Sequence, residues 1–94
     1  MELKEVGKKK TQYWAHRYTD DLEDGEDISN LIQAGNVNAN SYVYPGDYNY
    51  IVEYGKKHDE THYLDHGCWV VVSSTGKLWV LDDADYRARF EEKR

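Results

Sequence analysis

The first patterned segment of the chain is a stretch of alternating side chains at residues 11–19. One set of positions carries Tyr13, Ala15 and Arg17, and the other set carries Trp14, His16 and Tyr18. A period of two residues with many aromatic side chains is typical of a strand that has two different faces. We therefore predict a β-strand over residues 11–19.

A helical spacing of apolar residues follows further along the chain. Ile28, Leu31 and Ile32 stand at positions i, i+3 and i+4, which is the spacing of one helix face. The sequence therefore predicts a short amphipathic helix over residues 27–34, with Gly35 as the C′ residue after its end.

A second short helix is predicted near the end of the chain. Asp82 or Asp83 can cap its first turn, and the helix then continues to about Glu92. Tyr86 and Phe90 are four residues apart, so they lie on the same helix face and form its inward stripe.

The segments between the two helices are typical of strands joined by tight turns. Short runs rich in aromatic or β-branched residues occupy residues 41–44, 48–54, 60–64, 68–73 and 77–81. Gly, Pro, Asp and Asn separate most of these runs. Residues 68–73 (CWVVVS) are apolar almost throughout, as expected of a central strand. The predicted fold class is α+β: an antiparallel sheet of about five strands with two short helices.

Length and composition indicate one folded domain over residues 1–94, with residues 1–10 as a flexible N-terminal arm. Nine Tyr, three Trp and one Phe argue against disorder, because disordered chains are poor in aromatic residues. The chain has no apolar run long enough to span a membrane, and its N-terminus lacks the layout of a signal peptide. The single Cys68 cannot form an internal disulfide, so we expect a reducing cytoplasm.

The formal net charge of −6 opposes binding to long nucleic acids, whose affinity comes mostly from cationic neutralisation of phosphates. Six acidic residues cluster in an acidic stretch at residues 20–27: Asp20, Asp21, Glu23, Asp24, Glu26 and Asp27. The stretch has two interpretations. It can mimic a DNA backbone, or it can be a solvated loop leading into a helix whose N-terminus favours carboxylates.

Two segments together resemble a widespread family of small phage-encoded proteins. Members of this family carry an N-terminal strand like KKPVVVEAVQWTGDN, a short helix and a C-terminal segment like PGDWVVKGVKGEVYPVKPDIFEATYE. The first segment is similar to residues 9–21 (KKTQYWAHRYTDD), in which Ala15, Tyr18 and Thr19 fit the family pattern. The second is similar to residues 66–71 (HGCWVV) and 76–79 (GKLW), followed by Tyr86 and Phe90.

The sequence also departs from the family at several positions. Thr11 replaces a proline, Trp14 a glutamate and Arg17 a glutamine, and Cys68 stands where an aspartate is usual. The resemblance implies a phage origin and a small non-enzymatic protein in the host cytoplasm. Some small phage proteins of this kind are oligomeric sponges, which sequester cyclic nucleotide signals before host immune effectors can sense them.

Metal binding and catalysis are not expected from the sequence. His58, His62 and His66 recur every four residues and Cys68 follows, but on a strand these histidines would stand about 13 Å apart, too far for one ion. Cys68 lies beside Trp69 in a β-branched run, where a cysteine usually contributes packing. We therefore predict no catalytic residue, no metal and no cofactor.

The surplus of aromatic residues is the more informative feature. Trp69, Trp79, Tyr86 and Phe90 are expected in the core. The remaining aromatics exceed what one small core requires, so some should form a contact surface or a base-stacking site. Cyclic nucleotides need aromatic faces for bases and cations for phosphates. The residues predicted to bind such a ligand are Trp14, Arg17, Tyr18, Arg87 and Arg89.

Three hypotheses of function follow. The first is a homo-oligomer that sequesters a cyclic di- or trinucleotide without chemistry. The second is an acidic inhibitor that uses Asp20–Asp27 to block a host defence protein that binds nucleic acid. The third is an accessory phage protein with no small ligand. None of the three involves a membrane or direct binding of long nucleic acid.

Overall fold

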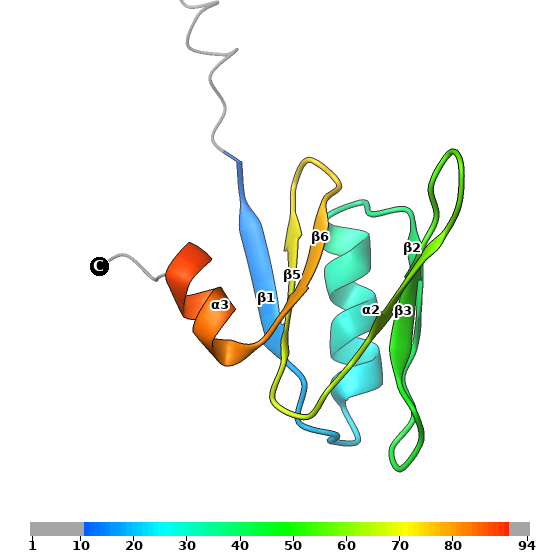
Figure 1. Ribbon diagram of the computed structural model, residues 1–94, viewed down its shortest axis with the longest axis vertical. Helices are drawn as coiled ribbons and strands as arrows, with labels where there is room; N and C mark the ends of the chain where they lie inside the picture. Colours follow the sequence, from blue (N-terminus) through cyan, green and yellow to red (C-terminus); the bar gives the residue numbers. More distant parts are fainter. Residues whose placement is uncertain (1–10, 91–94) are drawn as a thin grey trace, which may run out of the picture.

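The computed structural model describes residues 11–90, which form six strands and two helices (Figure 1). In chain order the elements are β1 (Tyr13–Arg17), α2 (Asp24–Ala34), β2 (Ala39–Tyr42), β3 (Tyr50–Glu53), β4 (Glu60–Tyr63), β5 (Trp69–Ser73), β6 (Leu78–Leu81) and α3 (Asp83–Arg89). Each predicted strand and helix is present, although α2 begins at Asp24 and β2 at Ala39, earlier than predicted. The arm predicted at residues 1–10 and the helix end predicted at Glu92 lie outside the described residues.

The strands form two antiparallel sheets of three strands each. The first has the order β1-β5-β6 and the second the order β2-β3-β4. The α+β class is confirmed, but the prediction of one sheet of about five strands is wrong. Backbone hydrogen bonds from Tyr18 N to Cys68 O and from Gly67 N to Tyr18 O join the end of β1 to the start of β5. β5 therefore pairs with β1 and β6, and it does not pair with β4, the strand that precedes it in the sequence.

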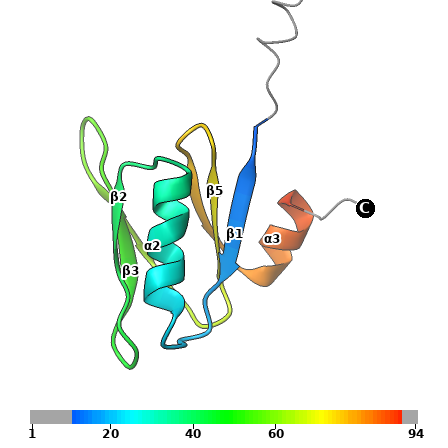
Figure 2. The same ribbon diagram turned by 180° about the vertical axis from the view of Figure 1, so that it is seen from behind.

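Helix α2 packs across one side of both sheets, as seen from behind in Figure 2. Its apolar stripe, Ile28, Leu31 and Ile32, is buried as the helical spacing predicted. The same core takes Val70 and Val72 from β5, where both side chains are fully buried. The core also includes Tyr18, Val37, Ile51, Leu64, Cys68 and Leu78. The helix thus joins the two sheets through one continuous apolar core.

The end of α2 differs from the predicted arrangement. Gly35 keeps a right-handed conformation with φ −85°, and Asn36 takes the left-handed one with φ 54°. Glycine is required at position 35 for a different reason. A Cβ atom there would lie 2.8 Å from Ser73 O and 3.0 Å from Val72 Cβ, closer than real Cβ atoms normally approach. Gly35 therefore lets the helix end pack directly on β5.

Helix α3 lies on the opposite face of the first sheet from α2 (Figures 1 and 2). Asp82 caps the helix as predicted, because its carboxylate accepts a hydrogen bond from Asp85 N at 2.8 Å. Trp69, Trp79, Tyr86 and Phe90 were predicted in the core, but all four are only partly buried. They pack between α3 and the outer face of the sheet, since Val70 and Val72 occupy the inner face of β5.

Candidate ligand-binding face

A row of three tyrosines crosses the second sheet from β2 to β4. Tyr42 pairs in register with Tyr50, and Tyr50 pairs with Tyr63. The rings of Tyr42 and Tyr50 are stacked at 5.1 Å between centroids, and those of Tyr50 and Tyr63 are tilted at 5.9 Å. Because Ile51 points into the core, its neighbour Tyr50 points to the outer face. Tyr42, Tyr50 and Tyr63, hereafter the tyrosine row, therefore present aromatic rings outside the core.

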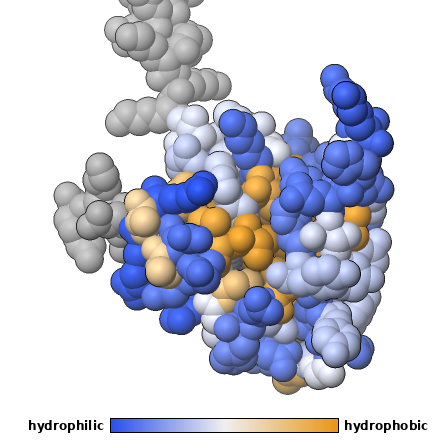
Figure 3. Space-filling model, in the orientation of Figure 1, coloured by the Kyte–Doolittle hydropathy of each residue, from blue (hydrophilic) through white to orange (hydrophobic). Residues whose placement is uncertain are grey.

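A cavity of about 310 Å³ lies where the row ends at Tyr63. It is formed by the end of β4, the turn before β5, the end of β6 and the start of α3. Its lining residues are Arg17, Tyr63, Asp65, His66, Gly67, Cys68, Val80, Leu81, Asp82 and Asp83. Figure 3 shows apolar surface on this side of the molecule, between α3 and the second sheet. Tyr63 belongs both to the tyrosine row and to this cavity, hereafter the Arg17 cavity.

Arg17 is held at the cavity wall by two contacts. Its Nε donates a hydrogen bond to Gly67 O at 3.2 Å, and its guanidinium carbon lies 5.7 Å from the centre of the Trp69 ring. The distance to Trp69 is within the range of a cation–π interaction. The side chain of Arg17 is exposed and forms no ion pair within residues 11–90, so its remaining N–H groups can meet an anion.

Carboxylates also line the Arg17 cavity and limit the negative charge that it can accept. Asp83 accepts hydrogen bonds from Arg87 Nε at 2.8 Å and from Trp69 Nε1 at 2.9 Å. The hydrogen bond from Arg87, followed by that from Trp69, lowers the pKa of Asp83. Asp65 and Asp82 add two further carboxylates to the lining. Among the residues that line this cavity, an anionic group is therefore favoured near Arg17, whose guanidinium is always charged.

The aromatic cluster under α3 is already filled by the protein itself. Tyr86 stacks on Trp69 with a centroid distance of 3.9 Å and an angle of 5° between the rings. Phe90 contacts Trp79 at 5.2 Å and Tyr13 at 5.3 Å. Because the ring of Tyr86 covers one face of the Trp69 ring, that face cannot stack on a ligand. These contacts instead anchor α3 to the sheet.

The five residues predicted to bind a ligand do not lie together. Arg17 projects from the outer face of the first sheet, whereas Trp14 packs on the inner face against the core. Arg87 is exposed and pairs with Asp83, which links it to the Arg17 cavity through the Asp83 carboxylate. Arg89 is exposed near the end of α3. The structure thus places Arg17 in the same cavity lining as Asp83, the partner of Arg87, and leaves Trp14 on the other face of the sheet.

Tyr18 is buried, with 4% of its surface exposed. Its hydroxyl accepts a hydrogen bond from Asn49 Nδ2 at 2.6 Å and donates one to Asp20 at 3.2 Å. Burial raises the pKa of Tyr18; the bond from Asn49 lowers it and the bond to Asp20 raises it further. Asn49 Oδ1 in turn accepts from Tyr44 N at 2.8 Å. Tyr18 therefore joins β1 to the loop before β3, and its ring offers no face to a ligand.

One member of the acidic stretch has a structural role. Asp24 is 1% exposed, and its carboxylate accepts hydrogen bonds from His16 Nε2 at 2.6 Å, Asp21 N at 2.6 Å and Thr19 N at 3.3 Å. The other five acids, Asp20, Asp21, Glu23, Glu26 and Asp27, are exposed. Asp24, Glu26 and Asp27 lie in the first turn of α2, where carboxylates are favoured.

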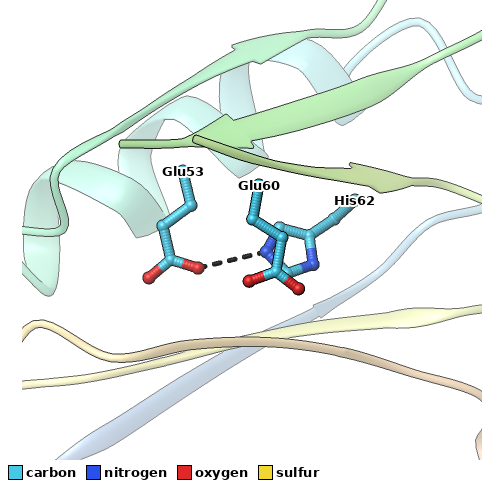
Figure 4. Close-up of side chains that lie close together, drawn as sticks. All are labelled: Glu53, Glu60 and His62. Carbon is cyan, nitrogen blue, oxygen red and sulfur yellow. Dashed lines mark hydrogen bonds and ion pairs between the residues drawn. The ribbon is translucent and has the colours of Figure 1, made fainter. Parts of the chain in front are cut away.

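The histidines and Cys68 do not form the four-ligand cage that the sequence spacing made conceivable. Cys68 is buried in the core, and burial raises the pKa of its thiol to about 11. A different group is brought together instead: one oxygen or nitrogen each from Glu53, Glu60 and His62 lie within 4.8 Å of one another (Figure 4). Strand pairing assembles this group, since Glu53 and Glu60 are cross-strand partners.

Tyr63, Glu53 and Glu60 were missed as candidate residues, although the sequence carries a signal for them. The strands predicted at residues 48–54 and 60–64 follow each other along the chain, and in the structure they pair with Tyr50 opposite Tyr63 and Glu53 opposite Glu60. Their adjacency predicts that the two strands pair, but a register centred on residues 55–59 would set Glu53 opposite Thr61, so only the structure gives the exact pairs.

Comparisons of the chain with protein-family models, curated proteins and solved structures found no match. Within residues 11–90, neither helix is long and apolar enough to cross a membrane.

Proposed function

We propose that this protein binds a small nucleotide of the cyclic di- or trinucleotide class and sequesters it without chemistry. The observation that carries the proposal is the tyrosine row, which ends at Tyr63 in the wall of the Arg17 cavity. Tyrosine rings stack on bases of any sequence, and an arginine at the end of the row can receive a phosphate. The phage origin and the host cytoplasm suggested by the family resemblance belong to the same proposal.

The energetics favour an assembly of more than one copy. Two stacked bases and one charge-assisted hydrogen bond supply a gross total of about 4–9 kcal/mol. A dissociation constant of 1 μM already requires about 8 kcal/mol, and association itself has an entropic cost. One copy of the site is therefore too weak to compete with a host receptor. A two-fold homo-oligomer around a two-fold symmetric cyclic dinucleotide would double the contacts.

Two features support a role without catalysis. The single thiol, Cys68, is buried with a raised pKa, so little nucleophilic thiolate forms near neutral pH. The buried carboxylate of Asp24 is occupied by three hydrogen bonds and faces neither the tyrosine row nor the Arg17 cavity. Base stacking and phosphate contacts need no such reactive groups.

Calorimetry with a panel of cyclic di- and trinucleotides tests the proposal. Tyr63→Ala and Arg17→Ala should each weaken binding by about tenfold or more, because each removes a contact of about 1–3 kcal/mol. Tyr48→Ala is the matched control, because Tyr48 is 91% exposed and lies outside the tyrosine row. This variant should bind the nucleotide with the same affinity as the wild type. Far-UV circular dichroism checks that each variant is folded.

A wild type that binds no member of the panel would end the proposal for these ligands. If Tyr63→Ala binds the nucleotide as tightly as Tyr48→Ala does, the tyrosine row is not part of the binding site. Light scattering at tens of micromolar should return a multiple of the protomer mass of 11.1 kDa, and a mass of one protomer would contradict the homo-oligomer.

The acidic inhibitor is the alternative function, and five exposed carboxylates in the acidic stretch favour it. Its target would be a host defence protein that binds nucleic acid. Replacing Asp20, Asp21 and Glu23 with the corresponding amides, while leaving the buried Asp24 intact, separates the two functions. The inhibitor should lose its effect on a target, whereas nucleotide binding should stay unchanged.

A further inference from the structure

Glu53 and Glu60 form an unusual cross-strand pair in the β3–β4 hairpin. They are direct partners in the antiparallel register, with His62 two residues further along β4 on the same face. Like charges directly opposite each other destabilise a sheet. A neighbouring positive charge would therefore stabilise a pair of this kind.

Within residues 11–90, His62 is the one side chain described as paired with either carboxylate. His62 Nε2 lies 3.1 Å from Glu53 Oε1, and the side chains are 17% and 30% exposed. Within residues 11–90, neither lysine nor arginine forms an ion pair with Glu53 or Glu60. Two carboxylates thus lie around a single imidazole at the edge of the core. The imidazole belongs to His62, which is the cross-strand partner of the buried Ile51.

Figure 4 shows the three side chains pointing toward one another from neighbouring strands. One donor atom from each lies within 4.8 Å of the others. Ligands bound at 2.0–2.2 Å to one tetrahedral ion stand roughly 3.3–3.6 Å apart. The pair of Glu53 and His62 is already at 3.1 Å, so a small rotation of the Glu60 side chain, which is exposed, completes the arrangement.

A cavity beside the group has room for further ligands. It measures about 180 Å³ and is lined by Glu53, Tyr54, Gly55, His58 and Glu60. A water molecule takes about 30 Å³ in the liquid, so the cavity can hold the water that completes a metal coordination shell. The donor set of two carboxylates and one imidazole, with an open fourth position, suits Zn²⁺.

We propose that Glu53, Glu60 and His62 bind one Zn²⁺ ion, which neutralises the two carboxylates and fastens β4 to β3. The ion takes the place of the hydrogen between His62 and Glu53. This site lies on the opposite sheet face from the tyrosine row, because Tyr50 and Ile51 alternate along β3. It does not depend on the proposed nucleotide site.

Calorimetric titration of the metal-free protein with Zn²⁺ tests the proposal, and the wild type should bind one ion per chain. Loss of an outer-shell partner reduces metal affinity by roughly 10–100-fold, so loss of a direct ligand in Glu60→Gln or His62→Gln should cost about 100-fold or more. Glu26→Gln is the matched control, since it makes the same chemical change at an exposed position of α2. Its affinity for Zn²⁺ should equal that of the wild type.

Thermal unfolding provides a second measurement. Added Zn²⁺ should raise the melting temperature of the wild type and of Glu26→Gln, because the ion binds the folded state. Glu60→Gln should show no increase. Ca²⁺ should neither raise the melting temperature nor displace Zn²⁺, since Ca²⁺ requires six to eight oxygen ligands.

The proposal is overturned if the wild type binds no Zn²⁺, or if Glu60→Gln and His62→Gln bind it as tightly as the control. It is also overturned if Ca²⁺ competes with Zn²⁺ for the site. Circular dichroism of each variant distinguishes a lost ligand from a lost fold, and Glu60→Gln is suited to this because Glu60 is exposed.

Discussion

Replacement of Asp24 by alanine is expected to be among the most damaging single changes in the chain. The Asp24 carboxylate is 1% exposed and joins three separate parts of the protein. It accepts hydrogen bonds from His16 on β1 and from the backbone N–H groups of Thr19 and Asp21 in the following loop. Alanine removes the acceptor and leaves all three donors in place.

The cost follows from the number of donors and their surroundings. An unsatisfied buried donor costs about 1–3 kcal/mol. Loss of the hydrogen bond from Asp21 N, at 2.6 Å, should cost an amount near the upper end of this range. Loss of the longer bond from Thr19 N, at 3.3 Å, should cost an amount near its lower end. His16 is 24% exposed, so water recovers part of its contribution. We expect Asp24→Ala to lower the free energy of unfolding by about 3–5 kcal/mol, out of about 5–14 kcal/mol for a domain of this size.

Urea denaturation measures this loss. With a slope of about 1–3 kcal/mol per molar urea, the midpoint should fall by roughly 2 M. Glu26→Gln, an exposed change in the same helix turn, should stay within about 0.5 kcal/mol of the wild type. If Asp24→Ala also stays within that range, the carboxylate does not join these segments and the reasoning is refuted.

The same carboxylate predicts how stability depends on pH. Burial alone would raise the pKa of Asp24, but the hydrogen bonds from His16, Asp21 and Thr19 outweigh it and hold the pKa below its ordinary 3.8. A carboxyl with a lower pKa in the folded state contributes stability that is complete above the unfolded pKa. This contribution is lost as the pH falls through the folded value. As the pH falls below about 4, the wild type should therefore lose more stability than Asp24→Asn.

Two further predictions concern packing. Gly35→Ala should destabilise the protein by about 1–3 kcal/mol in urea denaturation, because the new Cβ meets Ser73 O at 2.8 Å and Val72 at 3.0 Å while the backbone conformation itself suits alanine. A loss below about 0.5 kcal/mol would mean that the helix end moves freely away from β5. The buried Cys68 thiol, whose pKa is about 11, should react with a thiol reagent at pH 8 far more slowly in the folded protein than in urea. Equal rates would show that the thiol is accessible.

Local patterns predicted the elements because the elements depend on neighbouring residues. The alternation at residues 11–19 placed Tyr18 on the opposite face from Arg17, and the structure confirms this. The apolar run CWVVVS predicted a central strand, and β5 lies between β1 and β6. The Asp82 cap is also confirmed. Each of these features is decided within a few residues of chain.

The start of α2 and the position of the tryptophans needed more than local pattern. Six acids within residues 20–27 give no unique helix start, and the contact between Asp24 and His16 selects one. In β5 the residues on both faces are apolar, so the pattern could not say which face α2 would cover. The helix covers Val70 and Val72, which leaves Trp69 under α3 instead of in the core.

The strands and helices could be predicted from local patterns alone, and composition showed more tyrosine than one small core can hold. The tertiary structure decided which distant side chains meet. Pairing of β1 with β5 split the strands into two sheets, and the register of β3 with its neighbours aligned Tyr42, Tyr50 and Tyr63. The same register set Glu53 opposite Glu60. These juxtapositions depend on strand pairing and on which sheet face α2 covers, and the packing of the whole chain selects both.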